Sequence, residues 1–291
     1  MKLATLFQIV ILIGQIVPST LFAENLSSSS GNLYYPRPEV INDSRGLFPL
    51  RVLQLVLAKV HAGYVLTPSD RTMDQDRALL QLEMPNGGID VVWTMTSADR
   101  ELRLAPVRIP IDKGLIGWRL VLISNKTPEK FKSVFTRDEL RKLIACQGHD
   151  WPDTAILRGN GIQVVTNPNY QNLFRLVTEG IADYFPRSSL EIWNELDKHS
   201  SEGIMLDPYI TIHYSAAMYF FVNKTNTKLL NDISNGFEKA IADGSFERLF
   251  QSEYGEKLRK AKFSSRHIIN LENPLLPKLT PTDRKELWFS P

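Results

Sequence analysis

The stretch IDVVWTMTSADR, residues 89–100, carries two signals that decide the fold class. Its first half, Ile89–Thr94, is rich in β-branched and aromatic residues and predicts a strand. Its second half, Thr96–Arg100, is polar and predicts a turn where that strand ends. Strand and helix signals alternate through most of the remaining chain, which favours an α/β fold with mainly parallel sheets.

Helices are indicated by apolar residues at helical spacing and by capping signals. Thr136 and Glu139 have the spacing of a capping box, as do Ser188 and Glu191, and Asn169 is a good N-cap. These patterns predict helices at about 47–60, 74–82, 136–142, 152 onward, 170–177, 190–196, 230–241 and 246–261. Strands or extended segments are predicted at about 34–35, 64–66, 89–94, 102–111, 117–123, 143–147, 162–166, 181–185, 210–213 and 218–222.

The amino-terminal segment has the organisation of a secretory signal peptide. A positive Lys2 precedes an apolar stretch over residues 3–17, and Ala23 offers a small residue for cleavage. A transmembrane anchor is the alternative, but the stretch is shorter than the ~20 apolar residues that span a bilayer. We therefore expect a cleaved signal over 1–23, a disordered Ser-rich leader over 24–33 and a periplasmic location.

Composition excludes several classes of protein. The 291 residues include 34 Lys and Arg against 32 Asp and Glu, with no basic cluster, so nucleic acid is a poor candidate partner. The single cysteine, Cys146, excludes an intrachain disulfide and a cysteine-based metal cage, and the five histidines form no ligand-like pair. The sequence has no nucleophile elbow, His-Glu-x-x-His helix or Walker loop. We therefore expect no catalysis, no metal and no cofactor.

Three stretches together resemble the family 3 extracellular solute-binding proteins, which have the type II periplasmic binding protein fold. They are residues 89–100, the stretch GIADYFPR at 180–187, and the returning strand and terminal helix pair within 219–246. The stretches WPDT and YFPR look like a divergent bacterial subgroup of transporter substrate-binding-domain proteins. The resemblance covers roughly residues 34–265, and the order and spacing of the motifs carry it.

The resemblance implies two α/β lobes joined by hinge strands, with a central cleft between them. Lobe one would comprise residues 34–122 and 214–291, and lobe two would comprise residues 123–213. The extended segments near 102–123 and 204–222 are the expected crossings. Ligands of such open sheets lie beyond the carboxyl ends of the strands, and closure about the hinge buries the solute.

Arg100 is the sharpest candidate for a solute contact. A guanidinium fork matches a carboxylate bidentately, and the resemblance implies that the arginine of this motif holds the solute carboxylate. Alternatively, Arg100 is a surface residue paired with Asp99 or Glu101. The family usually has small hydroxyl residues five to eight positions before this arginine, and this chain departs from that pattern with Val92, Trp93, Thr94 and Met95. Trp93 could stack on a ring or an apolar solute, or pack in the core.

A second candidate site begins where the strand at 143–147 ends. The turn that follows opens a helix and leaves backbone N–H groups that could bind an anion. Asp150 and Asp153 could instead have a purely structural role, because both could cap that helix. Gly148 permits close approach of a solute, and Thr154 offers a hydroxyl. His149 could be a titrating contact or only a turn residue, and Trp151 could line the cleft or wedge the helix onto the sheet.

Arg187 is the third candidate. The resemblance implies an aspartate in this neighbourhood to hold the solute ammonium, and a cation in its place would favour an anionic solute. Alternatively, Arg187 pairs with Asp183 or Glu191 and contacts no solute.

These features favour an exported, non-catalytic solute-binding protein. We expect a monomer that captures a small amino-acid-like or anionic solute between two lobes and hands it to a membrane transporter. One alternative is an extracytoplasmic sensor or interaction protein that uses the same fold to signal to a membrane partner. Another is a hydrolase with an unrecognised site.

Overall fold

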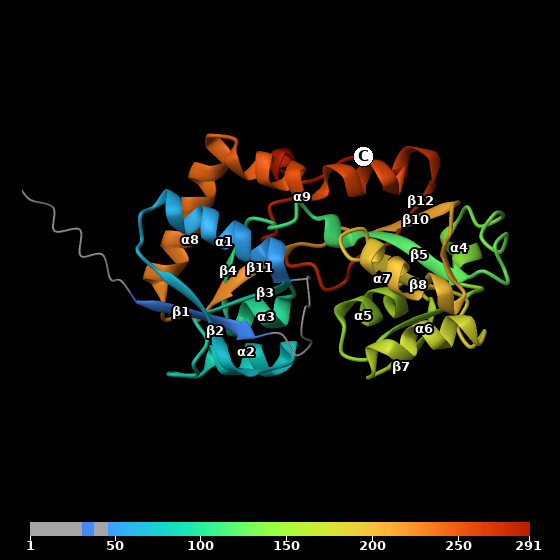
Figure 1. The fold of residues 1–291 in the computed structure, drawn as a ribbon, viewed down its shortest axis with the longest axis horizontal. Coiled ribbons are helices and arrows are strands. Elements are labelled where there is room, and N and C mark those ends of the chain that lie inside the picture. The colour runs from blue at the N-terminus through green and yellow to red at the C-terminus, as the bar shows by residue number, and fades with distance from the viewer. Residues whose placement is uncertain (1–30, 38–45) are drawn as a thin grey trace, which may run out of the picture.

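The computed structural model describes residues 31–37 and 46–291. The expected signal peptide and most of the expected leader lie outside the described residues. Strand β1 (Asn32–Arg37) takes up the end of that leader, and Leu33 is buried in the core. The described elements form two lobes side by side, and the chain crosses between them (Figure 1).

The first lobe is built around β11 (Met218–Val222), an almost completely buried strand. Alternate side chains of β11 pack on opposite faces, Phe220 and Val222 toward α1 and α8, and Tyr219 and Phe221 toward α2. β11 pairs antiparallel with β3 and β4, while β1 and β2 form a parallel pair. The other elements of this lobe are α1 (Leu47–Lys59), β2 (Val65–Thr72), α2 (Gln75–Glu83), β3 (Val91–Met95), α3 (Ala98–Arg103), β4 (Ala105–Val107) and α8 (Thr227–Ala242).

The second lobe is built around β5 (Trp118–Ser124), in which every residue is buried. β5 pairs antiparallel with β8, β9 and β10, and β12 adds to β10 in parallel. The parallel pair of β6 and β7 joins this sheet beside β8 through a bridge between Ala145 and Tyr184. The other elements are α4 (Arg137–Leu140), β6 (Ile144–Gly148), α5 (Pro152–Gly159), β7 (Gln163–Asn167), α6 (Tyr170–Thr178), β8 (Phe185–Ser188), α7 (Ile192–His199), β9 (Ile204–Leu206), β10 (Ile210–His213) and β12 (His267–Asn270).

The expectation of mainly parallel sheets is wrong, because the two central strands run against their neighbours. β5 and β11 each arrive from the other lobe. The neighbouring strands of each sheet run toward the other lobe and end at the edge that faces it. A strand that enters from the other lobe begins at that same edge of the sheet and runs in the opposite direction. Its pairing with them is therefore antiparallel.

The prediction of a strand at 181–185 is also wrong, since only the last of these residues, Phe185, belongs to β8. The residues before it close the end of α6 instead. Gly180 adopts φ +75°, and the N–H groups of Ile181 and Ala182 both donate to the carbonyl oxygen of Leu176. A left-handed glycine after the last helical turn commonly ends a helix in this way.

One of the two expected capping boxes is confirmed. The Thr136 hydroxyl accepts from the Glu139 N–H, and the Glu139 carboxylate accepts from the Thr136 N–H. The box expected at Ser188 and Glu191 is wrong, because Ser188 is the last residue of β8 and its hydroxyl accepts from the Leu190 N–H. Helix α7 begins at Ile192 without a side-chain cap, which leaves the Glu191 carboxylate free for another partner.

Two segments cross between the lobes beside each other. Residues 108–117 lead from β4 to β5, and residues 214–217 lead from β10 to β11. The Tyr214 N–H donates to the carbonyl oxygen of Gly117 at 3.2 Å. The expected extended segment at 102–111 begins inside α3, which ends only at Arg103. The crossings themselves fall within the two regions where the sequence predicts them.

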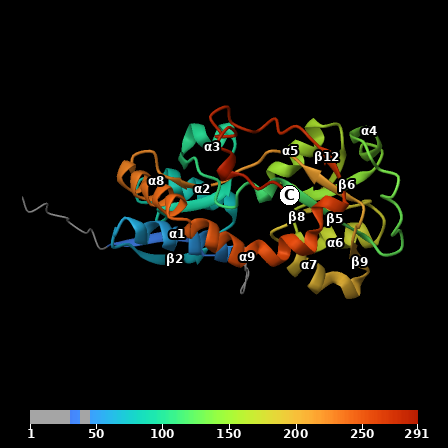
Figure 2. The ribbon, with the colours of Figure 1, turned by 90° about the horizontal axis from the view of Figure 1, so that it is seen from above.

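Helix α9 (Ser245–Ala261) runs along both lobes (Figure 2). At its start Phe246 packs edge-on against Phe237 of α8, with ring centroids 5.2 Å apart. Just after its end Phe263 lies 5.2 Å from the ring of Trp118 in β5. The helix therefore connects the cores of the two lobes on the side where the chain crosses.

Gly117→Ala is expected to lower the free energy of unfolding by about 1–3 kcal/mol, the usual cost of overpacking. An added Cβ would lie 2.0 Å from the carbonyl oxygen of Tyr214, so the crossing segments would have to separate. Gly255→Ala in α9 is the matched control, because the nearest atom is the end of the Gln251 side chain at 3.2 Å. This control should raise stability by about 0.5–1 kcal/mol. Chemical denaturation measures both, and equal effects would contradict the close approach.

Asp112 shapes the first crossing. Its carboxylate accepts from the N–H groups of Gly114 at 3.1 Å and Ile116 at 2.8 Å. These bonds hold a turn in which Lys113 (φ 51°) and Gly114 (φ 73°) both adopt left-handed backbone conformations. The side chain is almost completely buried, and this burial raises the pKa of Asp112 to about 6.

Asp112→Asn should gain stability relative to the unmodified protein as the pH rises. The pKa of Asp112 is about 6 in the folded protein against an ordinary value of 3.8, so ionisation is harder in the folded state. The unmodified protein therefore loses up to about 3 kcal/mol as the pH rises from about 4 to 7, and asparagine cannot ionise. Denaturation at several pH values measures the difference. A difference that stays constant with pH would contradict the raised pKa.

Candidate functional site

A cavity of about 560 Å³ lies where the two lobes face each other. This volume falls within the ~300–1,000 Å³ typical of small-molecule pockets. The first lobe contributes the start of α3 and the first turn of α2, and the second lobe contributes the start and one face of α5. Two residues come from the C-terminal segment. The lining comprises Asp76, Ser97, Ala98, Asp99, Arg100, Arg103, His149, Asp150, Trp151, Pro152, Thr154, Ala155, Arg158, Pro274 and Leu275.

Arg100 is oriented in this cavity by its own loop. Its Nη1 donates to the Thr94 hydroxyl at 2.9 Å and to the carbonyl oxygen of Met95 at 2.6 Å. Ser97 caps α3 by accepting from the Arg100 N–H. Within the described residues, the Nε and Nη2 groups make no hydrogen bond, so one edge of the fork remains unused. Burial lowers the pKa of Arg100, but a guanidinium stays charged at neutral pH.

Thr94 and Trp93 lie on opposite sides of β3 and serve the site differently. The buried Thr94 hydroxyl accepts from Arg100 and donates to Gln75 at 2.6 Å, so it positions the guanidinium. Trp93 packs against Tyr35 at 5.8 Å and Phe220 at 6.4 Å between ring centroids. Its indole is therefore part of the first lobe's core packing, and neither residue is in the lining of the cavity.

The start of α5 brings three of its four candidates to the cavity. His149 is exposed, and its Nδ1 lies 3.6 Å from the Asp150 carboxylate. The Thr154 hydroxyl donates to the carbonyl oxygen of Gly148 at 2.7 Å and fixes the turn. Gly148 itself lies beneath Trp151, since a Cβ there would be 2.5 Å from the indole. The small size of Gly148 therefore serves the seating of Trp151.

Arg187 is held within the second lobe, and the cavity lining does not include it. Its guanidinium is buried and lies 2.7 Å from the Glu195 carboxylate and 2.8 Å from that of Glu191. It also stacks on the rings of Trp151 and Phe185 at 4.8 and 4.9 Å. Burial acts to lower its pKa, but the two carboxylates raise the pKa of Arg187 well above its usual range. Two negative partners already balance this cation.

A second buried network lies beside the cavity, and the sequence did not predict it. Arg119 of β5 pairs with Asp153 in the first turn of α5 at 2.5 Å, and the Tyr214 hydroxyl donates to the same carboxylate. The residues are nearly inaccessible to solvent. One signal was available, because Arg119 interrupts the apolar strand run at 117–123 and a buried guanidinium requires an anionic partner. The network fixes α5 against the sheet and the crossing.

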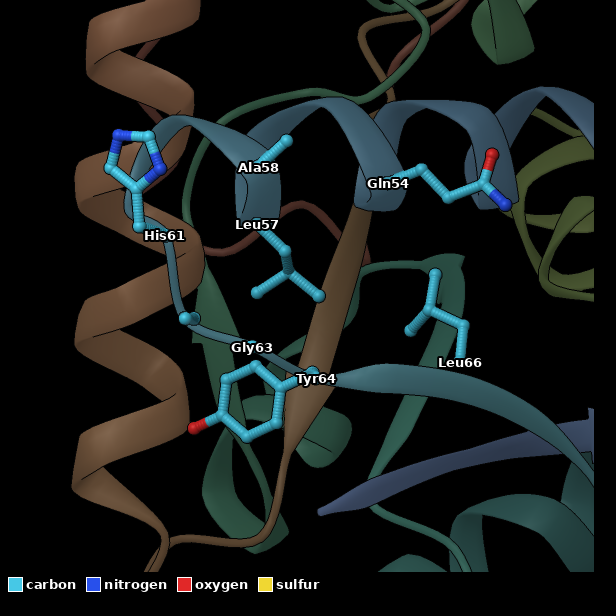
Figure 3. Close-up of a pocket in the computed structure, with 8 residues that line it drawn as sticks. Gln54, Leu57, Ala58, His61, Gly63, Tyr64 and Leu66 are labelled. Carbon is cyan, nitrogen blue, oxygen red and sulfur yellow. The ribbon is translucent and has the colours of Figure 1, made fainter. Parts of the chain in front are cut away.

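A different cavity of about 440 Å³ lies within the first lobe, between the end of α1 and the start of β2 (Figure 3). Leu57 and Leu66 form its apolar wall. The hydroxyl of Tyr64 points toward α8, where it donates to Asp232 at 3.0 Å. Its lining contains His61 but no arginine, lysine, aspartate or glutamate, so it lacks the paired charges of the inter-lobe cavity.

No family model and no curated protein matches the sequence. Among solved structures, the chain is similar to a probable amino-acid ABC transporter extracellular-binding protein from Bacillus subtilis, with 16% identity and a TM-score of 0.56 over 77% of this chain and 97% of that one. The chain has the type II periplasmic binding protein fold. This confirms the two-lobed α/β architecture that the resemblance implies.

Two further neighbours with the periplasmic binding protein fold differ in role. One is a histidine kinase sensor domain with similarity to periplasmic binding proteins, at 15% identity and a TM-score of 0.55 over 77% of this chain and 94% of that one. Another is an ancestral amino acid-binding protein described as a precursor of cyclohexadienyl dehydratase, at 14% identity and a TM-score of 0.50 over 77% and 93%. At such identities the likeness establishes the fold alone.

Over residues 31–37 and 46–291, no group of three or more His, Cys, Asp or Glu side chains is placed to hold a metal ion. No helix in that part is long and apolar enough to cross a bilayer. Cys146 is buried, and burial raises the pKa of its thiol, which makes it a poor nucleophile.

Proposed function

We propose that this protein is an exported, non-catalytic solute-binding protein that captures a small amino-acid-like solute between its lobes. The observation that carries the proposal is the unused edge of Arg100 in the inter-lobe cavity. Nη1 is anchored to the protein, so the guanidinium is already oriented, and Nε and Nη2 remain to donate to a carboxylate in parallel. Preorganised donors of this kind bind an anion at low entropic cost.

The charges around the cavity favour a zwitterion over a doubly anionic solute. The lining carries three arginines and three aspartates, and one of these arginines, Arg103, is paired with Asp99 at 2.9 Å and also with Glu83. Arg187, the second cation expected to attract an anion, is balanced within the second lobe. Asp76 and Asp150 make no hydrogen bond to a cation among the described residues, although Asp150 lies 3.6 Å from His149 Nδ1 and both carboxylates act to raise the pKa of Arg100. We assign these two carboxylates to the solute ammonium.

A thermal-shift screen of amino acids, dicarboxylates and small peptides tests this proposal. A solute at about 100 times its Kd stabilises the folded state by about 2.7 kcal/mol, which raises the melting temperature by several degrees. Amino acids should give the largest increases in melting temperature, and calorimetry then confirms their binding. Failure of every member of the panel to raise the melting temperature would contradict solute binding. Chromatography of the solutes that bind would detect their conversion to product, and such conversion would contradict a non-catalytic role.

A sensor is the second candidate function, and the likeness to a histidine kinase sensor domain supports it. Both functions use the same cleft, so the identity of the solute cannot separate them. Neighbouring genes for a permease and an ATPase would favour transport, with a periplasmic location and a transporter as partner. A neighbouring sensor kinase, together with kinase activation by the solute-loaded protein, would favour sensing.

A further inference from the structure

The segment after β12, residues 271–276, is fixed beside the cleft, and we call it the C-terminal strap. The side chain of Asn160, at the end of α5, donates to the carbonyl oxygen of Glu272 at 2.7 Å and accepts from its N–H at 3.0 Å. Asn273 donates to the carbonyl oxygen of Ser215, in the second crossing, at 2.8 Å. These bonds attach the strap both to the second lobe and to the hinge.

The strap places two apolar side chains, Pro274 and Leu275, in the lining of the inter-lobe cavity. Pro274 lies over Gly159, where an added Cβ would be 3.2 Å from its Cγ. The Leu275 N–H donates to the Asn273 side chain at 2.9 Å, and its side chain is half-buried at the edge of the second lobe's core. Neither side chain can donate or accept a hydrogen bond, so they offer a solute hydrophobic contact only.

The strap continues an apolar surface that begins on α5. The indole of Trp151 and the side chains of Pro152 and Ala155 lie in the same lining. Arg158 lies in the same lining, and its guanidinium donates to the carbonyl oxygen of Val164 at 3.3 Å. The cavity thus combines the charged groups around Arg100 with an apolar wall that ends on the strap.

We propose that the C-terminal strap sets the specificity of the cleft, and that the solute carries a large apolar side chain that packs against Leu275 and Pro274. This inference rests on the proposed function, because it takes the solute carboxylate to be held by Arg100. Hydrophobic contact then discriminates between solutes by the area that each side chain buries. Leucine-like and phenylalanine-like side chains therefore gain more from the strap than a methyl group, which offers little apolar area.

Calorimetry with alanine, leucine and phenylalanine tests the inference. Leu275→Ala should weaken the binding of leucine and phenylalanine about tenfold and change that of alanine less than about twofold, because only long side chains lose contact. Leu279→Ala is the matched control, since Leu279 is 69% exposed on the same C-terminal segment and lies outside the lining. Leu275→Met keeps the volume and should keep the preference. Melting temperatures establish that each variant folds.

The outcomes separate this inference from the proposed function. Equal losses for alanine and phenylalanine in Leu275→Ala would overturn the strap's role in specificity while solute binding stands. An unmodified protein that binds alanine as tightly as phenylalanine, or prefers a solute without an apolar group, would also overturn it. An unmodified protein that binds no member of the wider panel would overturn the proposed function itself.

Discussion

Replacing Arg100 with lysine is expected to weaken solute binding at least about 100-fold. Its free edge can donate two charge-assisted hydrogen bonds to a carboxylate, each worth roughly 1.5–3 kcal/mol. Lysine keeps the positive charge but has no planar fork, so the bidentate contact is lost. Two lost bonds correspond to more than two orders of magnitude in Kd. Calorimetry with the best solute from the thermal-shift screen measures the change.

Lysine is a better test than alanine, because Arg100 also supports its own loop. Nη1 donates to Met95 and Thr94, and an alanine would leave a buried carbonyl oxygen without its donor. The control is Arg103→Lys, since Arg103 lines the same cavity but is already paired with Asp99 and Glu83. It should change affinity less than about threefold. Unchanged affinity in Arg100→Lys would remove Arg100 from the site.

Glu195→Ala is expected to lower the free energy of unfolding by about 3–5 kcal/mol. The Nε–H of Arg187 is shared between the two Glu195 carboxylate oxygens at 2.9 Å each, and Nη2 donates to one of them at 2.7 Å, all in a buried environment. Its removal leaves Glu191 as the one remaining carboxylate within salt-bridge distance of that guanidinium, among the described residues. Leaving a buried charge poorly compensated is among the most destabilising single changes.

The melting temperature should fall by roughly 6–20 °C, which differential scanning calorimetry measures. Glu256→Ala is the control, because Glu256 pairs with Lys260 on the exposed face of α9, where both side chains are more than half exposed. An exposed helical pair contributes about 0.3–0.5 kcal/mol. A Glu195→Ala variant no less stable than Glu256→Ala would mean that the Arg187 network does not stabilise the second lobe.

Local patterns predicted most of the elements that frame the candidate site. Residues 91–95 form a strand that ends in a polar turn, and Arg100 lies in the short helix that follows. Pro152 begins α5, and Asn169 caps α6 through hydrogen bonds to Gln171 and Asn172. These features depend on side-chain periodicity and on hydrogen bonds between near neighbours in the chain, so a single sequence contains the information.

The orientation of individual side chains depended on neighbours that are distant in the chain. Trp93 alternates with Thr94 along β3, but only its packing on Tyr35 and Phe220 decides that the indole faces the core. Arg187 had Asp183 and Glu191 as its expected structural partners, and the structure pairs it with Glu191 and with Glu195 of α7, whereas Asp183 pairs with Lys130. Charge pairing in a buried site is set by which elements pack together.

Local sequence patterns were enough to predict the alternation of strands and helices and the position of Arg100 after its strand. The tertiary structure alone decided that both central strands run antiparallel to their neighbours, and that the strap from the far end of the chain lines the cleft. The difference lies in the range of the interactions. Hydrogen bonds along the backbone act over a few residues, whereas a cleft forms from surfaces that only folding brings together.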